Sequence, residues 1–257
     1  MPYQFIREIG SGGMGSVYEG RSPDGKHVAI KMLRAEIAYN PEYRSMFEQE
    51  ARILKQMNHP SVVKIIGDSF SDERNNLYLP MEFIEGESLS EHINKNGPFS
   101  ENEAIEIMAK ILRAMEYVHQ TGNAHRDIKP SNVMLKPNKE ICVIDFGIAK
   151  DMKTHTGKTI GMVIGTDGYM SPEQAGGNNI DHRTDIYSLG CLLFFLVTGR
   201  DAVTKKQDAF IKATDIAFET LFGGAAGGGK SYGQLIDALL FALKYPKSKQ
   251  IIFMEMF

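Results

Sequence analysis

The stretch His125-Arg126-Asp127-Ile128-Lys129-Pro130-Ser131-Asn132 places an acid, a cation and an amide within a few positions of one another. Asn132 lies five positions after Asp127, and a second acid, Asp145, lies 18 positions after it. Carboxylate and amide oxygens are ligands that hard cations accept, often together with phosphate oxygens. The spacing therefore predicts metal ions held against a phosphate chain, while Asp127 faces a hydroxyl nucleophile.

A glycine-rich string, Gly10-Ser11-Gly12-Gly13-Met14-Gly15, matches G-x-G-x-x-G. Alone it is weak, because dinucleotide-binding folds use the same string and an ordinary turn can also be rich in glycine. A dinucleotide fold needs a helix after the glycines, whereas Ser16-Val17-Tyr18-Glu19-Gly20 is typical of a strand that enters a turn. The string therefore predicts a hairpin whose backbone amides lie over phosphates, and its six residues are candidate nucleotide-binding residues.

The segment Val28-Ala29-Ile30-Lys31 follows on a predicted strand. Because side chains alternate along a strand, Ala29 and Lys31 share a face, which Val17 would also line. Lys31 would there be a point charge on the α- and β-phosphates. Strand lysines are usually solvated, but the apolar neighbours argue against an exposed face.

A buried lysine needs a carboxylate, and the predicted helix over 41–57 offers Glu48 and Glu50. Glu50 shares a helix face with Phe47, Leu54 and Met57, so it is expected to point inward. Glu48 shares a face with two basic residues, which is the solvated side. Helical periodicity therefore selects Glu50 as the partner of Lys31.

Each remaining residue of the site has an expected role. Asp127 would accept or orient the proton of the attacking hydroxyl, and Lys129 would neutralise charge on the γ-phosphate. Asn132 and Asp145 would hold Mg²⁺. Each residue alone would more often be a surface or capping residue, and their joint spacing is what favours phosphoryl transfer.

Composition excludes several classes of function. The chain has 257 residues, 42% of them hydrophobic and 24% charged, which is ordinary for a soluble globular protein. A net charge of −3 with scattered basic residues argues against nucleic-acid binding and against a basic membrane patch.

The longest apolar run, Cys191 to Val197, is too short to span a bilayer, and the N-terminus lacks the features of a signal peptide. Cys142 and Cys191 are expected to be buried free thiols, and we predict a soluble cytoplasmic protein.

Turn signals and periodicities predict an α+β fold, with a small antiparallel β-rich N-lobe plus one helix and a larger, mostly helical C-lobe. Two S-x-x-E capping boxes, Ser88–Glu91 and Ser100–Glu103, predict helix starts. An irregular segment is expected over 146–173, with helices from there to the end. Strands are expected over 4–10, 15–21, 26–33, 62–70, 76–84, 132–136 and 141–145.

Together these motifs resemble the eukaryotic-type (Hanks-type) Ser/Thr protein kinases, most closely the bacterial branch, over about residues 3–200. Lys129, two positions after Asp127, is similar to the Ser/Thr-type pattern. The segment Gly165-Thr166-Asp167-Gly168-Tyr169-Met170-Ser171-Pro172-Glu173 resembles the end of the activation loop, with Ser171 where Ala is commoner. The resemblance implies a protein-kinase-like bilobal fold.

The resemblance also assigns domain limits. It implies one kinase domain over 1–257, with an N-lobe of about 1–81, a hinge of about 82–87 and a C-lobe of about 88–257. Beyond Thr198-Gly199 the pattern departs from the family, because Arg200-Asp201-Ala202-Val203 stands where Pro-Phe is usual. Near the end, Lys249 stands in for an Arg that would pair with Glu173 and gives up its bidentate geometry.

Further site residues are implied by the resemblance alone. Met81 would be the gatekeeper, adenine would bond to the backbone of Glu82 and Ile84, and Val17, Ala29 and Met134 would enclose the base. Pro80, in the same strand as Met81, is unusual because it lacks an N–H. Asp185 would hold the backbone of the catalytic loop, and Thr166 would contact Asp127 and Lys129.

Arg126, which precedes the catalytic acid, often pairs with an activation-loop phosphate in this family. Thr154, Thr156 and Thr159 are the candidate acceptors, and a phosphate there would order the loop through bonds to Arg126. An unmodified polar loop is the alternative.

The resemblance implies an enzyme that transfers the γ-phosphoryl group of ATP to Ser or Thr hydroxyls of proteins and phosphorylates its own activation loop. ATP and Mg²⁺ would be required, with Mn²⁺ as an alternative, and the chain would be a monomer or weak dimer with protein substrates. A nucleotide-binding scaffold without catalytic activity would lack at least one of five residues. All five are present: Lys31, Glu50, Asp127, Asn132 and Asp145. A small-molecule kinase is disfavoured by the segment 165–173.

Overall fold

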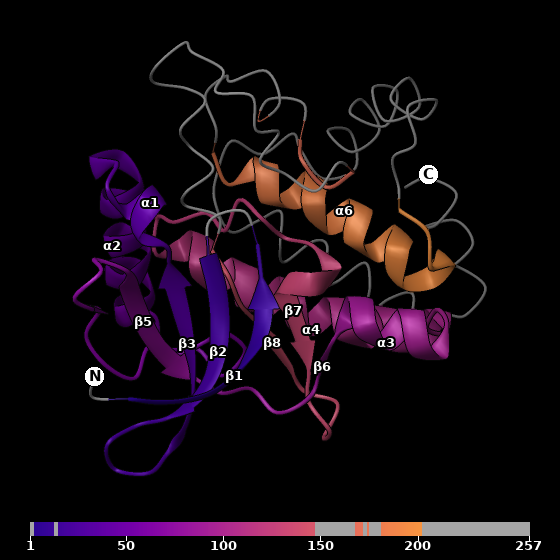
Figure 1. The fold of residues 1–257 in the computed structure, drawn as a ribbon. Helices are drawn as coiled ribbons and strands as arrows, with labels where there is room; N and C mark the ends of the chain where they lie inside the picture. The colour runs from indigo at the N-terminus through magenta and orange to yellow at the C-terminus, as the bar shows by residue number, and fades with distance from the viewer. Residues whose placement is uncertain (1–2, 13–14, 147–167, 172–173, 175–180, 202–257) are drawn as a thin grey trace. The chain divides into compact units, whose positions relative to one another are not determined.

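Hairpin-connected strands begin the fold where the sequence predicts alternation and turns (Figure 1). In the computed structural model they belong to an antiparallel sheet with the order β1-β2-β3-β5-β4. The strands are β1 (Gln4–Ser11), β2 (Gly15–Arg21), β3 (His27–Leu33), β4 (Phe70–Ser71) and β5 (Leu77–Glu82). The predicted strands over 4–10, 15–21, 26–33 and 76–84 are therefore confirmed within a residue or two at their ends.

The structure describes residues 3–12, 15–146, 168–171, 174 and 181–201. These residues group by their contacts into two units, the first holding 3–86 and 144–146 and the second holding 87–143 and the described residues from 168 onward. The division falls inside the predicted hinge of 82–87. The single domain over 1–257 stays a prediction.

The two faces of β3 bury different neighbours. Val28 and Ile30 are fully buried on one face, where they pack with Tyr78 of β5. Leu33 lies on the other face, and it packs with residues of two helices, α1 (Ala35–Ala38) and α2 (Pro41–Gln56). Since side chains alternate along a strand, Lys31 shares this helix-covered face.

One predicted strand, over 62–70, is wrong except for its last residue. Ile65 forms an isolated bridge with Met81. On one side of the bridge, the amide of Ile66 donates to the carbonyl of Pro80, but Pro80 has no N–H to donate back to Ile66. On the other side, the amide of Lys64 donates to the side-chain Oε1 of Glu82 at 3.0 Å instead of to its backbone carbonyl. Proline is tolerated in β5 because its backbone faces this irregular segment rather than β3.

We expect Gly15→Ala to destabilise the first unit by about 1–3 kcal/mol, because a Cβ on Gly15 would lie 1.7 Å from the carbonyl oxygen of Met32. β2 would have to move away from β3. Gly12→Ala is the matched control, because its Cβ would have no atom within 4 Å. Urea denaturation of both variants checks this, and equal stabilities would contradict it.

The second unit is mostly helical, with α3 (Leu89–Asn96), α4 (Glu101–Gln120) and α6 (Arg183–Thr198). Both predicted capping boxes are present, since Ser88 and Ser100 exchange hydrogen bonds with Glu91 and Glu103. Gly199 caps the C-terminus of α6, and its φ of 67° suits glycine. A small sheet of order β6-β7-β8 completes the unit, with a 3₁₀ turn before it. These elements are β6 (Glu87–Ser88), η1 (Pro130–Asn132), β7 (Val133–Leu135) and β8 (Ile141–Val143).

The core of the second unit lies along α4, where Ile105, Leu112 and Met115 are fully buried. α4 and α6, with 20 and 16 residues, are longer than α3, which has 8 (Figure 1). The α+β class is confirmed. Within the described residues, no helix has both the length and the apolar character that a membrane crossing requires. The predicted helices after residue 201 lie outside the described residues.

Candidate active site

A lysine lies between two carboxylates in the first unit. The Nζ of Lys31 is 2.6 Å from Glu50 Oε1 and 3.0 Å from Asp145 Oδ1. Glu50 lies on the buried face of α2 with Phe47 and Leu54, as helical periodicity predicts. Glu48 lies on the solvated side and pairs with Arg44. Packing of α2 against β3 thus brings Lys31 and Glu50 together.

The pKa of Lys31 reflects competing effects. Burial alone would lower it, because the interior disfavours the charged ammonium. The negative charges of Asp145 and Glu50, with their hydrogen bonds, outweigh burial and raise the pKa of Lys31 above its ordinary value. Lys31 is therefore a fixed positive charge at neutral pH, as the binding of phosphate oxygens requires.

Asp145 follows β8 in an unusual backbone conformation. Its φ is 56°, in the left-handed region that non-glycine residues seldom adopt, although Asp tolerates it better than most. The next residue, Phe146, is 2% exposed. The turn and the buried ring together fix the direction of the Asp145 carboxylate, which meets Lys31.

The segment around η1 gathers the other predicted catalytic residues in the second unit. The Nζ of Lys129 lies 3.2 Å from Asp127 Oδ2, and Nδ2 of Asn132 donates to the same oxygen at 3.0 Å. Asn132 also donates to the backbone carbonyl of Asp127 at 2.9 Å. Two donors therefore fix the rotamer of Asp127, whose side chain keeps 14% of its surface exposed.

Asp185 of α6 holds the backbone that precedes Asp127. Its two carboxylate oxygens accept the amides of His125 at 2.8 Å and Arg126 at 2.6 Å, and His119 Nε2 lies 2.7 Å from Oδ2. Asp185 is fully buried. The contact with the loop backbone agrees with the supporting position that the resemblance implies for this residue.

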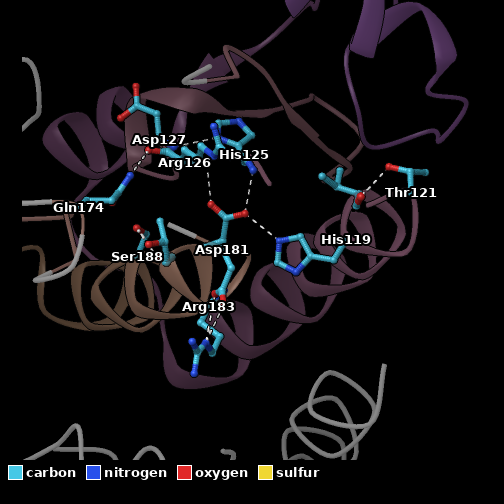
Figure 2. Close-up of polar contacts among 12 residues, drawn as sticks. His119, Thr121, His125, Arg126, Asp127, Gln174, Asp181, Arg183 and Ser188 are labelled. Atoms are coloured by element: carbon cyan, nitrogen blue, oxygen red, sulfur yellow. Dashed lines mark hydrogen bonds and ion pairs between the residues drawn. The ribbon is translucent and has the colours of Figure 1, made fainter. Parts of the chain in front are cut away.

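Arg126 occupies a strained backbone position, with a φ of 67°. Its amide is held by Asp185, and its carbonyl accepts a bond of 3.0 Å from Gln174 (Figure 2). Burial lowers the pKa of the Arg126 guanidinium, while the charge of Asp185 acts against that decrease. Bonds on both sides of the residue therefore hold the conformation that leads into Asp127.

We expect Asp185→Asn to lower the free energy of unfolding by about 2–4 kcal/mol. An amide group would present an NH₂ to one of the two backbone donors and leave that donor unsatisfied. Asp181→Asn is the matched control, because Asp181 is near the surface and Asn still accepts the bond from the amide of Arg183. Chemical denaturation of both variants checks this, and similar losses in the two would contradict it.

The glycine-rich string is described except for Gly13 and Met14, which lie outside the described residues. Gly10 and Ser11 end β1, and Gly15 begins β2. The amide of Gly12 donates to the carbonyl of Gly15 at 2.8 Å, and the carbonyl of Gly12 accepts from Arg34 at 3.1 Å. Close strand packing, rather than a phosphate, explains the glycine at 15, while Gly12 has open space where a Cβ would lie.

Three candidate adenine-binding residues of the first unit, Val17, Ala29 and Met81, share one sheet face. Val17 of β2 stands opposite Lys31 of β3, and Ala29 of β3 stands opposite Met81 of β5. Directly opposed residues of antiparallel strands point to the same side. Glu82 ends β5, and Ile84 follows it. Met134, the remaining candidate, lies in β7 of the second unit.

Three supporting residues were not predicted from the sequence. His119 contacts Asp185, Gln174 holds the carbonyl of Arg126, and buried Ser171 bonds to Thr184 at 2.9 Å. His119 lies on the apolar stripe of α4, four positions after a buried methionine, so the periodicity that selects Glu50 also indicates it. Ser171, unusual for the family, is explained by its paired hydroxyl.

The predicted activation-loop residues lie outside the described residues. They are Thr154, Thr156, Thr159, Thr166 and Glu173. Their roles, and the pairing of Arg126 with a phosphate, stay predictions.

The residues predicted to hold a divalent cation are Asn132 in the second unit and Asp145 in the first. Within the described residues, no three His, Cys, Asp or Glu side chains gather into a metal site. The Nδ2 of Asn132 donates to Asp127, which leaves Oδ1 as the ligand atom of the amide. Asp145 has a carboxylate. Amide and carboxylate oxygens are ligands that divalent cations accept, and the binding of one ion by both residues stays a prediction.

Comparison with known proteins identifies the class. The protein kinase domain family matches residues 3–223, and this chain belongs to that family. The predicted kinase fold is confirmed by this match together with the β-rich first unit and helical second unit. Protein kinases as a family use ATP and a divalent metal ion and act on protein substrates.

The curated relatives include several bacterial kinases. A probable serine/threonine-protein kinase of Streptomyces coelicolor, SCO3848, is 40% identical over 204 residues, covering 77% of this chain and 30% of the relative. The serine/threonine-protein kinases PknB of Mycobacterium leprae and PrkC of Bacillus subtilis are 39% and 41% identical, covering 77% of this chain and 32% and 30% of the relatives. The predicted likeness to the bacterial Hanks-type branch is confirmed. The chain spans about a third of the length of these relatives.

Proposed function

We propose that this chain is an ATP-dependent protein kinase that phosphorylates Ser and Thr residues of proteins, including its own activation loop. The observation that carries the proposal is Asp127, whose carboxylate is held by Lys129 and Asn132 at 3.2 and 3.0 Å. A fixed carboxylate with neighbouring cation and amide suits a substrate hydroxyl that attacks phosphorus. The bacterial relatives, which bear serine/threonine-kinase names, support the choice of Ser and Thr.

In the proposed reaction, the substrate hydroxyl oxygen bonds to the γ-phosphorus as the bond from that phosphorus to the β–γ bridging oxygen breaks. ADP leaves, and the hydroxyl proton passes to Asp127. Lys129 neutralises charge on the transferred group, and Lys31 holds the α- and β-phosphates. Asn132 and Asp145 would hold the divalent ion, Mg²⁺ or Mn²⁺, which supplies positive charge to the phosphate oxygens.

The proposal extends to the setting of the reaction. Cys142 and Cys191 are both buried as thiols rather than joined in a disulfide, which suits a reducing compartment. We therefore propose that this kinase domain acts in the cytoplasm.

The test is phosphoamino-acid analysis after incubation with γ-labelled ATP and Mg²⁺, with a generic basic protein as acceptor. The expected products are phosphoserine and phosphothreonine, lost on chelation and restored by Mg²⁺ or Mn²⁺. Binding of ATP without label in any protein would instead favour a nucleotide-binding scaffold, and phosphotyrosine alone would overturn the Ser/Thr assignment.

A further inference from the structure

An aromatic stack joins the start of β3 to the residue after β5. The rings of His27 and Phe83 have centroids 3.9 Å apart and an interplanar angle of 25°. Val28 pairs with Glu82, so one step further along the register His27 stands opposite Phe83. The stack therefore extends the pairing of the two strands by a side-chain contact beyond the last backbone pair.

His27 is itself held in place by charged neighbours in the same sheet. Its Nε2 lies 2.8 Å from Glu19 Oε1 in β2, and Arg7 Nε of β1 donates to the other oxygen of Glu19 at 2.7 Å. The hydrogen bond with His27, together with Arg7, holds the pKa of Glu19 below its ordinary value. Three strands therefore contribute to fixing the imidazole that meets Phe83.

The last residue of β5, Glu82, is also held by hydrogen bonds to the chain on the side away from β3. Glu82 donates its amide to the carbonyl of Lys64 at 2.8 Å, and its side chain accepts the amide of Lys64 at 3.0 Å. Phe83 is the next residue, and Ile84 follows it. Of the three residues, Glu82 is anchored by backbone and side-chain bonds, and Phe83 is anchored by its ring.

The stack lies beside the residues expected to meet adenine. His27 lies two positions before Ala29 in β3 and Phe83 two positions after Met81, so both extend the face on which Ala29 and Met81 pair. Glu82 and Ile84, whose backbone is expected to bond to adenine, flank Phe83. A shift of Phe83 would move both backbone groups.

We propose that the His27–Phe83 stack positions the backbone of residues 82–84 for adenine and so sets the affinity for ATP. His27 and Phe83 are positioning residues, and neither takes part in phosphoryl transfer. This inference rests on the proposed function, because it assumes that the segment binds the base of ATP.

The test measures ATP affinity with a fluorescent adenine nucleotide, together with KM for ATP and kcat. His27→Gln keeps an amide donor for Glu19 but removes the ring, whereas His27→Phe keeps a ring but removes the donor. We expect His27→Gln and Phe83→Leu each to weaken nucleotide binding by about 3–10-fold, with kcat unchanged within about twofold. The double variant should be no weaker than either single one, and His27→Phe and Phe83→Tyr should bind like wild type.

Unchanged affinity in Phe83→Leu, additive losses in the double variant, or equal losses in His27→Phe and His27→Gln would each overturn the inference. These outcomes leave phosphoryl transfer by the wild type intact. A wild-type chain that binds no adenine nucleotide would instead remove the proposed function and the inference with it.

Discussion

Asp127→Asn is expected to lower kcat for phosphoryl transfer by about 10³-fold, while nucleotide affinity changes by less than about threefold. The amide has the size of the carboxylate but neither its charge nor its ability to take a proton. It would also present an NH₂ to Lys129 and Asn132, both of which donate to Asp127 Oδ2. Steady-state kinetics and nucleotide binding measure the two effects separately.

The matched control for this prediction is Asp68→Asn. Asp68 is 89% exposed and pairs with Lys55 at the surface of the first unit, so the same change of charge occurs far from any proposed role. Its kcat should equal that of wild type within about twofold. A similar fall in both variants would mean that net charge, rather than the Asp127 carboxylate, sets the rate.

Lys31→Met is expected to lower kcat/KM for ATP by about 10²–10³-fold, because it removes the fixed positive charge beside the phosphates. The same change removes the ammonium group that pairs with Glu50, whose side chain is only 5% exposed. Because a buried carboxylate then lacks this partner, we also expect the free energy of unfolding to fall by about 1–3 kcal/mol. Activity and stability are lost for different reasons here.

A double variant separates those reasons. In Lys31→Met/Glu50→Gln no uncompensated charge remains at Glu50, so stability should recover toward that of wild type while activity stays low. Arg44→Gln/Glu48→Gln, which removes an exposed ion pair on the same helix, is the control and should change both quantities little. Recovery of activity in the Lys31–Glu50 double variant would contradict a direct role for Lys31.

Periodicity in the sequence was sufficient for the parts of the site that sit on regular elements. The choice of Glu50 over Glu48 needed only a helix face, and the shared face of Ala29 and Lys31 needed only strand alternation. Both follow from local geometry, which the residues themselves determine. The capping boxes of α3 and α4 were readable for the same reason.

Other features depend on distant parts of the chain and left no local signal. Arg126 adopts a φ of 67° because Asp185 and Gln174, far along the sequence, bond to the groups on either side of it. The segment 62–70 does not form the predicted strand, partly because Pro80 of β5 has no N–H to donate to it. A sequence pattern indicates which residues favour a strand, but it does not indicate which other strand will pair with them.

The most direct test of the central claim uses the Asp127→Asn chain as a substrate. This chain, incubated with γ-labelled ATP and Mg²⁺, should acquire no label by itself. Addition of a catalytic amount of wild-type chain should label it on Ser or Thr, because its hydroxyl groups are intact. Label in the Asp127→Asn chain alone at the wild-type rate, or no label in either mixture, would contradict phosphoryl transfer that depends on Asp127.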